Sequence, residues 1–170
     1  SERADAEYVW VLDPIDGTRA FIAGYPTFTT LIALCYHEIP LLGLIDQPIL
    51  RKRWQGITAD RAASPADSLA HQTSLQGALI ATTSTAYFTP AEARAMAEIE
   101  RRGAKFLREG DAYAYAMLAE GRIHAVIDAH MKPYDYCALV PIIAAYGIIT
   151  DWQGSPITIG GNGSVLATQN

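Results

Sequence analysis

Hydrophobic runs in the first third of the chain predict an antiparallel group of strands. Residues 8–12, YVWVL, are wholly apolar and indicate a buried strand that ends at Asp13. Residues 27–37 and 41–48 are strand-like and are joined by a short connection, which favours antiparallel pairing. Residues 51–57 are compatible with one more strand. A turn is expected at DPIDGT, directly after the first strand, followed by a short RAFIAG segment.

The second half alternates between strand and helix patterns. The clearest helix spans residues 89–103: Thr89 is a candidate N-cap, Pro90 takes the first helical position, Glu92 completes a capping box and Gly103 ends the helix. A second helix is predicted from a capping Asp111 to Gly121, and a third from Asp135 to Gly147 with a bend at Pro141. Strands are predicted at 77–84, 104–109, 122–129, 148–152 and 164–168.

This order of elements predicts one layered α/β domain over residues 1–170. An antiparallel part covers 1–58 and a βαβαβ part covers 77–170, with a loop or linker by composition at 59–77. Strands that first pair with each other and then alternate with helices are typical of helices layered with mixed sheets.

Composition and charge narrow the class of protein. Half of the 170 residues are hydrophobic, 18% are charged and the net charge is −5, which suits a globular core and disfavours disorder. Basic residues cluster only at 51–53 and 101–102, without the basic stripe of a nucleic-acid binder. No apolar run approaches the roughly 20 residues of a membrane span. We therefore expect neither nucleic acid nor membrane as a partner.

Two cysteines, Cys35 and Cys137, lie far apart in apolar contexts. Their number and spacing suit neither a disulfide framework nor a zinc site, so buried free thiols are expected. Free thiols fit a reducing compartment, and we predict a cytoplasmic protein. The histidines show no metal-ligand spacing, and His124 and His130, which flank a strand, are interpreted as structural or exposed.

The acidic stretch LDPIDGTRAF, residues 12–21, has two interpretations. As an isolated pentapeptide, D-P-x-D-G is good turn chemistry, and a plain turn is the better choice. However, an apolar strand delivers Asp13 to the edge of a core, where burying carboxylates costs several kcal/mol without a cation or donors. Asp13, Asp16 and the Ile15 carbonyl can face one point, and three hard oxygens suit Mg²⁺ or Mn²⁺. Backbone N–H groups after Gly17 can form an anion nest, to which the following Thr hydroxyl adds a donor.

A further ligand is expected from Asp135 in KPYDYCAL, at the start of an apolar helix. Taken alone, Asp135 reads as an ordinary N-cap residue. Paired with the first motif, it is predicted to be the third carboxylate of a metal site.

These two stretches resemble the signatures of the inositol monophosphatase-like family of Mg²⁺-dependent, lithium-sensitive phosphatases. WVLDPIDGTRAF is similar to the first signature, and KPYDYCALVPIIAAYGIITDWQG to the second, in the expected order. The segments DGTRAFIAG, LGLIDQP with a following RW, GDAYAYAMLAEG and KPYDYCALVP are similar to the histidinol-phosphatase branch. The resemblance covers essentially the whole chain. It implies the family's layered sugar-phosphatase fold and hydrolysis of histidinol phosphate in histidine biosynthesis. Inositol phosphate or another small sugar or nucleotide monoester is the alternative substrate.

The resemblance assigns a role to each matching position. It implies that Asp13, Asp16, Asp135 and the Ile15 carbonyl bind the metal, and that the three aspartates act in catalysis with a water-orienting Thr18. It places Gly17 and Thr18 on the phosphate. It also implies that Asp128 contacts the substrate, that Asp111 pairs with the substrate amine or caps a helix, and that Arg19 lies in the pocket or in solvent. Family members are often homodimers, which gives the same expectation here.

The chain departs from the family's pattern at its start. The family has an N-terminal helix pair and a Gly-Glu-Glu motif whose glutamate bridges the metals, whereas the upstream glutamates here, Glu2 and Glu7, lack that context. We expect an N-terminally truncated catalytic domain with weak or no turnover by these 170 residues. An alternative of another class is a non-catalytic phosphate- or metal-binding module, or a subunit that mainly dimerises.

Overall fold

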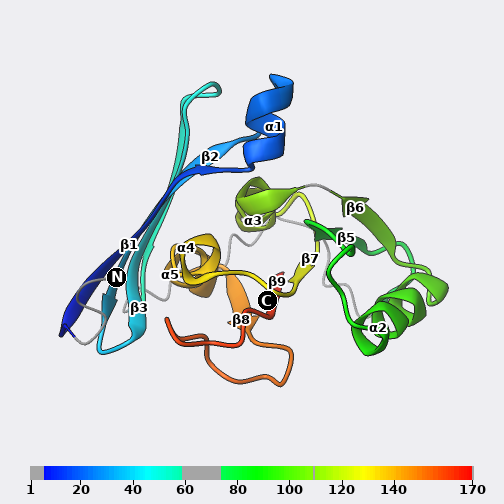
Figure 1. The fold of residues 1–170 in the computed structure, drawn as a ribbon. Helices are drawn as coiled ribbons and strands as arrows, with labels where there is room; N and C mark the ends of the chain where they lie inside the picture. The colour runs from blue at the N-terminus through cyan, green and yellow to red at the C-terminus, as the bar shows by residue number, and fades with distance from the viewer. Residues whose placement is uncertain (1–5, 59–73, 109, 170) are drawn as a thin grey trace.

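The computed structural model describes residues 6–58, 74–108 and 110–169. Two sheets stand on either side of a layer of helices (Figure 1). The first sheet is antiparallel, in the order β1-β2-β3-β4. Its strands are β1 (Tyr8–Asp16), β2 (Thr29–Tyr36), β3 (Ile39–Gln47) and β4 (Lys52–Ile57).

The second sheet is mixed, in the order β6-β5-β7-β9-β8. β5 pairs in parallel with β6 and β7, whereas β9 is antiparallel to β7 and β8. The strands are β5 (Leu79–Thr82), β6 (Lys105–Arg108), β7 (Ala125–Asp128), β8 (Gly147–Thr150) and β9 (Val165–Gln169). The prediction of layered helices and mixed sheets is thus confirmed. Residues 59–73 of the predicted loop, Glu109 of the strand predicted at 104–109, and Glu2 lie outside the described residues.

Three helices fill the space between the sheets, and a fourth covers the far face of the second sheet. α3, α4 and α5 contact strands of the first sheet, and α3 and α5 also contact the second sheet. α2 packs its Met96 and Ile99 on the opposite face of β5 and β7. The helices are α1 (Thr18–Ala23), α2 (Pro90–Arg101), α3 (Asp111–Ala119), α4 (Pro133–Tyr136) and α5 (Leu139–Ala144). None of the described helices is long and apolar enough to cross a membrane.

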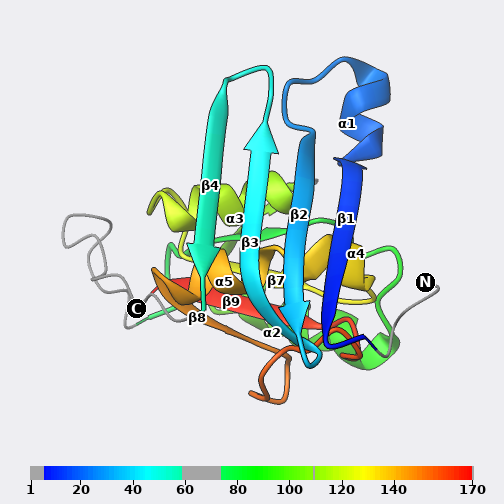
Figure 2. The same cartoon turned by 90° about the vertical axis from the view of Figure 1, so that its left-hand side faces the viewer.

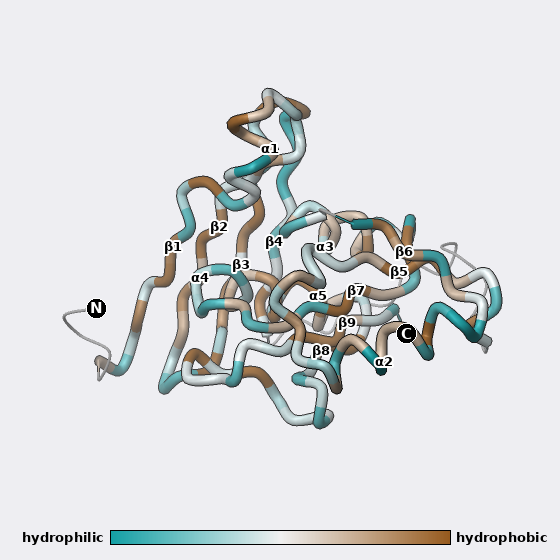
Figure 3. Tube along the Cα trace, turned by 45° about the vertical axis from the view of Figure 1, so that its right-hand side comes forward, coloured by the Kyte–Doolittle hydropathy of each residue, from teal (hydrophilic) through white to brown (hydrophobic). Residues whose placement is uncertain are grey.

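The main core lies between the sheets, where Leu31 and Ile45 of the first sheet meet Tyr115, Leu139 and Ile142 of the helices. The apolar segments of β1, β2 and β3 are visible in Figure 3. Glycine allows the closest approach: a side chain at Gly43 would overlap the carbonyl of Ala138, and one at Gly56 the carbonyl of Pro141. The backbone between α4 and α5 is therefore seated directly on the first sheet.

The prediction that YVWVL is a buried strand is wrong for one of its faces. Tyr8, Trp10 and Leu12 are 54%, 61% and 57% exposed, whereas Val9 and Val11 are half-buried against the core. Side chains alternate across a strand, so only one set can face the helices. Figure 2 shows the opposite face of the sheet turned toward the viewer, with the helices behind it. No element among the described residues covers that face.

Helix boundaries confirm some predictions and correct others. The capping box of α2 is present as predicted, with Thr89 and Glu92 bonded reciprocally. The single helix predicted over residues 135–147 is instead two short helices that are separated at Cys137 and Ala138. Pro141 accounts for the break, because it gives no N–H to the carbonyl four residues earlier and its ring clashes there. It is tolerated in the first turn of α5, where N–H groups have no helical acceptor.

Candidate functional site

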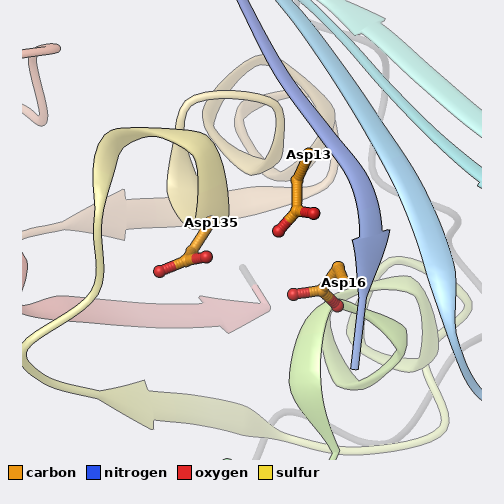
Figure 4. Close-up of side chains that lie close together, drawn as sticks. All are labelled: Asp13, Asp16 and Asp135. Atoms are coloured by element: carbon orange, nitrogen blue, oxygen red, sulfur yellow. The ribbon is translucent and has the colours of Figure 1, made fainter. Parts of the chain in front are cut away.

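Three carboxylates converge where the end of β1 meets α4. Oxygen atoms of Asp13, Asp16 and Asp135 all lie within 4.8 Å of one another. Asp13 and Asp16 come from β1 and Asp135 from α4, and their carboxylates face a common space (Figure 4). Among the described residues, no glutamate joins this cluster, and Glu7 is exposed.

A local irregularity in β1 brings two of the acids together. The strand runs on to Asp16, and its register with β2 shifts between Asp13 and Asp16, so the turn predicted directly after the first strand is wrong. Pro14 has no N–H for the ladder, which favours a bulge at this point. Its carbonyl instead accepts from the Thr30 hydroxyl at 2.8 Å, and Asp13 Oδ1 accepts the Ile15 N–H at 3.1 Å. The bulge leaves both carboxylates on the same side.

Asp16 is the most buried acid of the cluster, at 9% exposure. Its Oδ2 accepts the Ala112 N–H at 2.8 Å and the Thr29 hydroxyl at 3.3 Å. Burial raises the pKa of Asp16 to about 7, opposed by the bond from Ala112 and reinforced by the nearby negative charges of Asp111, Asp13 and Asp135. Within the described part of the chain, no Lys, Arg or His forms an ion pair with Asp16.

Asp135 lies in the first turn of α4 and not at its start, because the helix begins at Pro133. Its Oδ2 accepts the Lys132 N–H at 2.7 Å, which fixes the orientation of the carboxylate. Burial raises the pKa of Asp135, and the bond from Lys132 opposes that rise. The pKa of Asp13 is raised in the same way by burial and lowered by its bond from Ile15.

The donor set fits a hard divalent cation. Carboxylate oxygens are the ligands that Mg²⁺ and Mn²⁺ prefer, and a cation would relieve the raised pKa values of all three acids. The Ile15 carbonyl, predicted as a further ligand, accepts the Thr18 hydroxyl at 3.1 Å and keeps a second lone pair.

Gly17 separates the acidic motif from α1. Its φ of 75° is left-handed, and a Cβ there would also lie 3.1 Å from Asp111 Oδ2. Both facts favour glycine at this position. Thr18 begins α1, so the Gly17–Thr18 pair stands at the rim of the acidic cluster.

A cavity of about 420 Å³ includes the cluster. Nine residues that the sequence singled out line it: Asp13, Ile15, Asp16, Gly17, Thr18, Arg19, Asp111, Asp128 and Asp135. Sequence reasoning missed others on its wall, namely Thr83, Ser84, Tyr87, Ala112, Ala129, Met131 and Tyr134. For Thr83 and Ser84 the sequence did offer a signal, because the polar run TTST directly follows the apolar strand GALIA.

Asp111 does not cap α3, which corrects its predicted capping role. The helix starts at Asp111 itself, after Gly110, and no side-chain bond caps it. Asp111 has a φ of 42°, an uncommon value for a residue other than glycine, although Asp adopts it more readily than most. Its carboxylate instead lies against Gly17, on the wall of the pocket.

The structure also places the two histidines and the two cysteines for which predictions were made from the sequence. His124 is structural, since its Nδ1 accepts the Leu79 N–H at 3.0 Å. His130 is exposed, as interpreted, and it also lines the pocket, with its Nε2 3.0 Å from Glu92 Oε2. Cys35 and Cys137 are both buried and free, as predicted.

Comparisons with known proteins agree on one family. Residues 1–170 match the model described as the inositol monophosphatase family. The chain is 45% identical over 166 residues to the chloroplastic bifunctional phosphatase IMPL2 of Arabidopsis thaliana, covering 96% of this chain and 48% of the relative. It is 31% identical to a histidinol-phosphatase of Chlorobaculum parvum, covering 93% of this chain and 62% of that protein.

A solved structure gives the same result for the fold. An inositol monophosphatase from Zymomonas mobilis superposes with a TM-score of 0.88 at 40% identity, covering 98% of this chain and 67% of that one. The chain thus spans about half to two thirds of the relatives it matches.

Proposed function

The chain belongs to the inositol monophosphatase family, and from that premise we propose that its acidic pocket hydrolyses a small phosphate monoester with the help of Mg²⁺. The observation that carries the proposal is the convergence of Asp13, Asp16 and Asp135 beside Gly17 and Thr18. Anionic ligands next to backbone N–H groups suit a phosphate ester whose charge is neutralised by a cation.

The three aspartates and the Ile15 carbonyl would hold the divalent cations, with Mn²⁺ as a substitute. Bound cations of this kind lower the pKa of a water and neutralise charge on phosphoryl oxygens. Asp16 is already aimed by the Ala112 N–H and Asp135 by the Lys132 N–H, so the ligands need little rearrangement. Preorganised ligands of this kind support catalysis by electrostatic stabilisation.

The chain's own polar groups would orient the phosphate and the attacking water. Gly17 and Thr18 would donate backbone N–H groups to the phosphate, and the exposed Arg19 could add a guanidinium at the rim. The Thr18 hydroxyl, which already reaches the Ile15 carbonyl, would hold the water in line. Because cations and positioning suffice for phosphoryl transfer, no Ser, Cys or His nucleophile is needed.

We propose L-histidinol phosphate as the substrate. The support is the similarity to proteins named histidinol-phosphatase and the position of Asp111, whose carboxylate lies on the pocket wall next to Gly17. A carboxylate there would pair with the substrate's amine. Inositol phosphate is the second candidate, because the 40% identical solved structure is that of an inositol monophosphatase.

Phosphate release tests the reaction. We expect slow, Mg²⁺-dependent release from histidinol phosphate by the 170-residue chain, abolished by EDTA and by Asp13→Asn. Asp46→Asn is the matched control, because Asp46 pairs with Arg53 on the first sheet, away from the pocket. Release that survives EDTA and Asp13→Asn would contradict the metal mechanism. Full activity of the 170 residues would contradict the expectation of weak or no turnover without a bridging glutamate.

Substrate choice has its own test in Asp111→Asn. Asn keeps the shape and tolerates a positive φ, so the variant removes only charge. We expect KM for histidinol phosphate to rise about tenfold or more, as for loss of a charged hydrogen bond, while KM for inositol 1-phosphate does not rise. Faster turnover of inositol phosphate by the wild type, or equal effects on both substrates, would argue against histidinol phosphate.

A further inference from the structure

Asp128, at the end of β7, is almost fully enclosed by hydrogen-bond donors. Its Oδ1 accepts the Thr83 N–H at 2.6 Å and the Thr82 hydroxyl at 3.4 Å. Its Oδ2 accepts the Tyr115 hydroxyl at 2.9 Å and the Thr83 hydroxyl at 3.4 Å. The residue is only 2% exposed. Because a carboxylate has about four acceptor sites, these donors leave little capacity for a ligand.

The partners of Asp128 come from elements that carry the acidic cluster. Tyr115 is wholly buried in α3, three residues after Ala112, so the two lie on the same face of that helix. Ala112 gives its N–H to Asp16 at 2.8 Å. A movement of α3 at Tyr115 would therefore move the donor that holds Asp16.

Asp128 also connects two further segments of the pocket wall: the one that follows β5 and the one that leads to α4. Thr83 begins the segment after β5 that continues to Ser84 and Tyr87 on the pocket wall. The backbone after Asp128 leads through His130 to α4, which carries Asp135. The Asp128 carbonyl is fixed too, since it accepts the Trp152 indole N–H at 2.9 Å. One buried acid thus joins the supports of Asp16 and Asp135.

We infer that Asp128 and Tyr115 are positioning residues that set the spacing of the cation ligands, and that Asp128 does not contact the substrate. The inference rests on the proposed cation site. It replaces the substrate contact that the family resemblance implied for Asp128. Groups that bond a metal ligand directly change metal affinity by about 10- to 100-fold when they are removed, and because Asp128 and Tyr115 act one contact further out, a smaller change is expected for them.

Mn²⁺ titration by calorimetry tests the inference on the 170-residue chain without any need for turnover. We expect Tyr115→Phe to weaken Mn²⁺ binding by about threefold or more, less than the loss of a direct partner of a ligand. Tyr113→Phe is the matched control, because it removes the same group from the same helix where the ring packs against Trp54. Asp128→Asn keeps the shape but presents an N–H in place of one acceptor, and it should weaken binding in the same direction as Tyr115→Phe.

Each outcome bears on a different claim. Unaltered Mn²⁺ affinity in Tyr115→Phe and Asp128→Asn, with only a lower unfolding temperature, would show a structural role and overturn the inference. If Asp128→Asn leaves Mn²⁺ affinity unaltered but weakens the binding of histidinol phosphate in the same calorimetric assay, Asp128 is a substrate contact and the inference is overturned. Failure of the wild type to bind Mn²⁺ would instead remove the cation site itself, and the proposed function with it.

Discussion

Asp16 is the residue at which burial and function oppose each other most strongly. Its carboxylate is held by two protein donors, yet burial and three neighbouring acids raise its pKa to about 7. In an unfolded chain the same carboxyl has its ordinary pKa of 3.8. Folding without a cation therefore favours the protonated acid, and a cation would reverse that preference.

The pH dependence of stability follows from this shift. Between about pH 4 and pH 7 the folded metal-free chain binds more protons at Asp16 than the unfolded chain, so stability falls as pH rises. Relative to Asp16→Asn, which mimics the neutral acid, the wild type should lose up to about 4 kcal/mol across that window. Urea unfolding in EDTA at a series of pH values measures this difference. A difference that stays constant, or that shifts in favour of the wild type as pH rises, would contradict the assignment.

The sequence predicts the acidic residues of the site but not the residues that line the pocket beside them. Asp13, Asp16 and Asp135 were predicted to share a site only when the two acidic motifs were combined, because each motif alone reads as a turn or an N-cap, and the structure brings the three carboxylates together. Ser84 and Tyr87 were missed, because the pairing of β5 with the distant strand β7 places the segment after β5 beside the pocket. Tyr115 was missed because it reads as one more apolar residue of a buried helix, and the hydrophobic pattern does not reveal the bond that its hydroxyl donates to Asp128.

The short helices α4 and α5 are the elements on which the site depends most. Their junction at Cys137 and Ala138 is seated on Gly43, with no room for a side chain between them. Asp135 stands three residues before Ala138, so the contact with the first sheet fixes one cation ligand relative to the other two. The close approach of backbone to strand is the reason that glycine is needed there.

Gly43→Ala should therefore be strongly destabilising. The added methyl would overlap the Ala138 carbonyl, and overpacking of this kind costs about 1–3 kcal/mol or more. Gly160→Ala is the control, because nothing lies within 4 Å of a Cβ at that position. Chemical denaturation of both variants measures the difference. Equal free energies of unfolding of the two variants would show that Gly43 and Ala138 can move apart with little loss of stability.

Elements with strong end signals were predictable, and those shaped by tertiary contact were not. Thr89, Pro90 and Glu92 mark the start of α2 correctly, because capping is a local interaction. The continuation of β1 through Pro14 to Asp16 was missed, since the pairing with β2 outweighs the turn preference of the DPIDG motif. The break between α4 and α5 falls before Pro141, because proline has no N–H to donate to the carbonyl four residues earlier.

The whole molecule has one sheet face that the described elements leave open. Tyr8, Trp10 and Leu12 on β1 pair across the ladder with Tyr36, Leu34 and Ile32 on β2, so their side chains share one face of the sheet. Figure 2 looks onto the face of this sheet that lies away from the helices. Contiguous apolar patches of this kind mark contact surfaces or aggregation hazards. The hydrophobic pattern of the chain predicts the strands but not which face is covered, because coverage depends on the packing of other elements.

An apolar dye measures the consequence. We expect the 170-residue chain to bind 1-anilinonaphthalene-8-sulfonate and to self-associate in sedimentation velocity, and Trp10→Lys with Leu12→Lys to reduce both. Ile148→Lys is the control, because Ile148 is similarly exposed at 55% but lies on the second sheet. Dye binding that is unchanged in the double variant would place the accessible apolar surface elsewhere. The same sedimentation data test the expected homodimer.

The most direct test of the account is calorimetric titration of the chain with Mg²⁺, because every functional claim depends on the cluster of three aspartates as a cation site. We predict saturable binding by the wild type and by Asp46→Asn, and none by Asp13→Asn, Asp16→Asn or Asp135→Asn with folded circular dichroism spectra. Wild-type binding that all three variants retain would contradict the account.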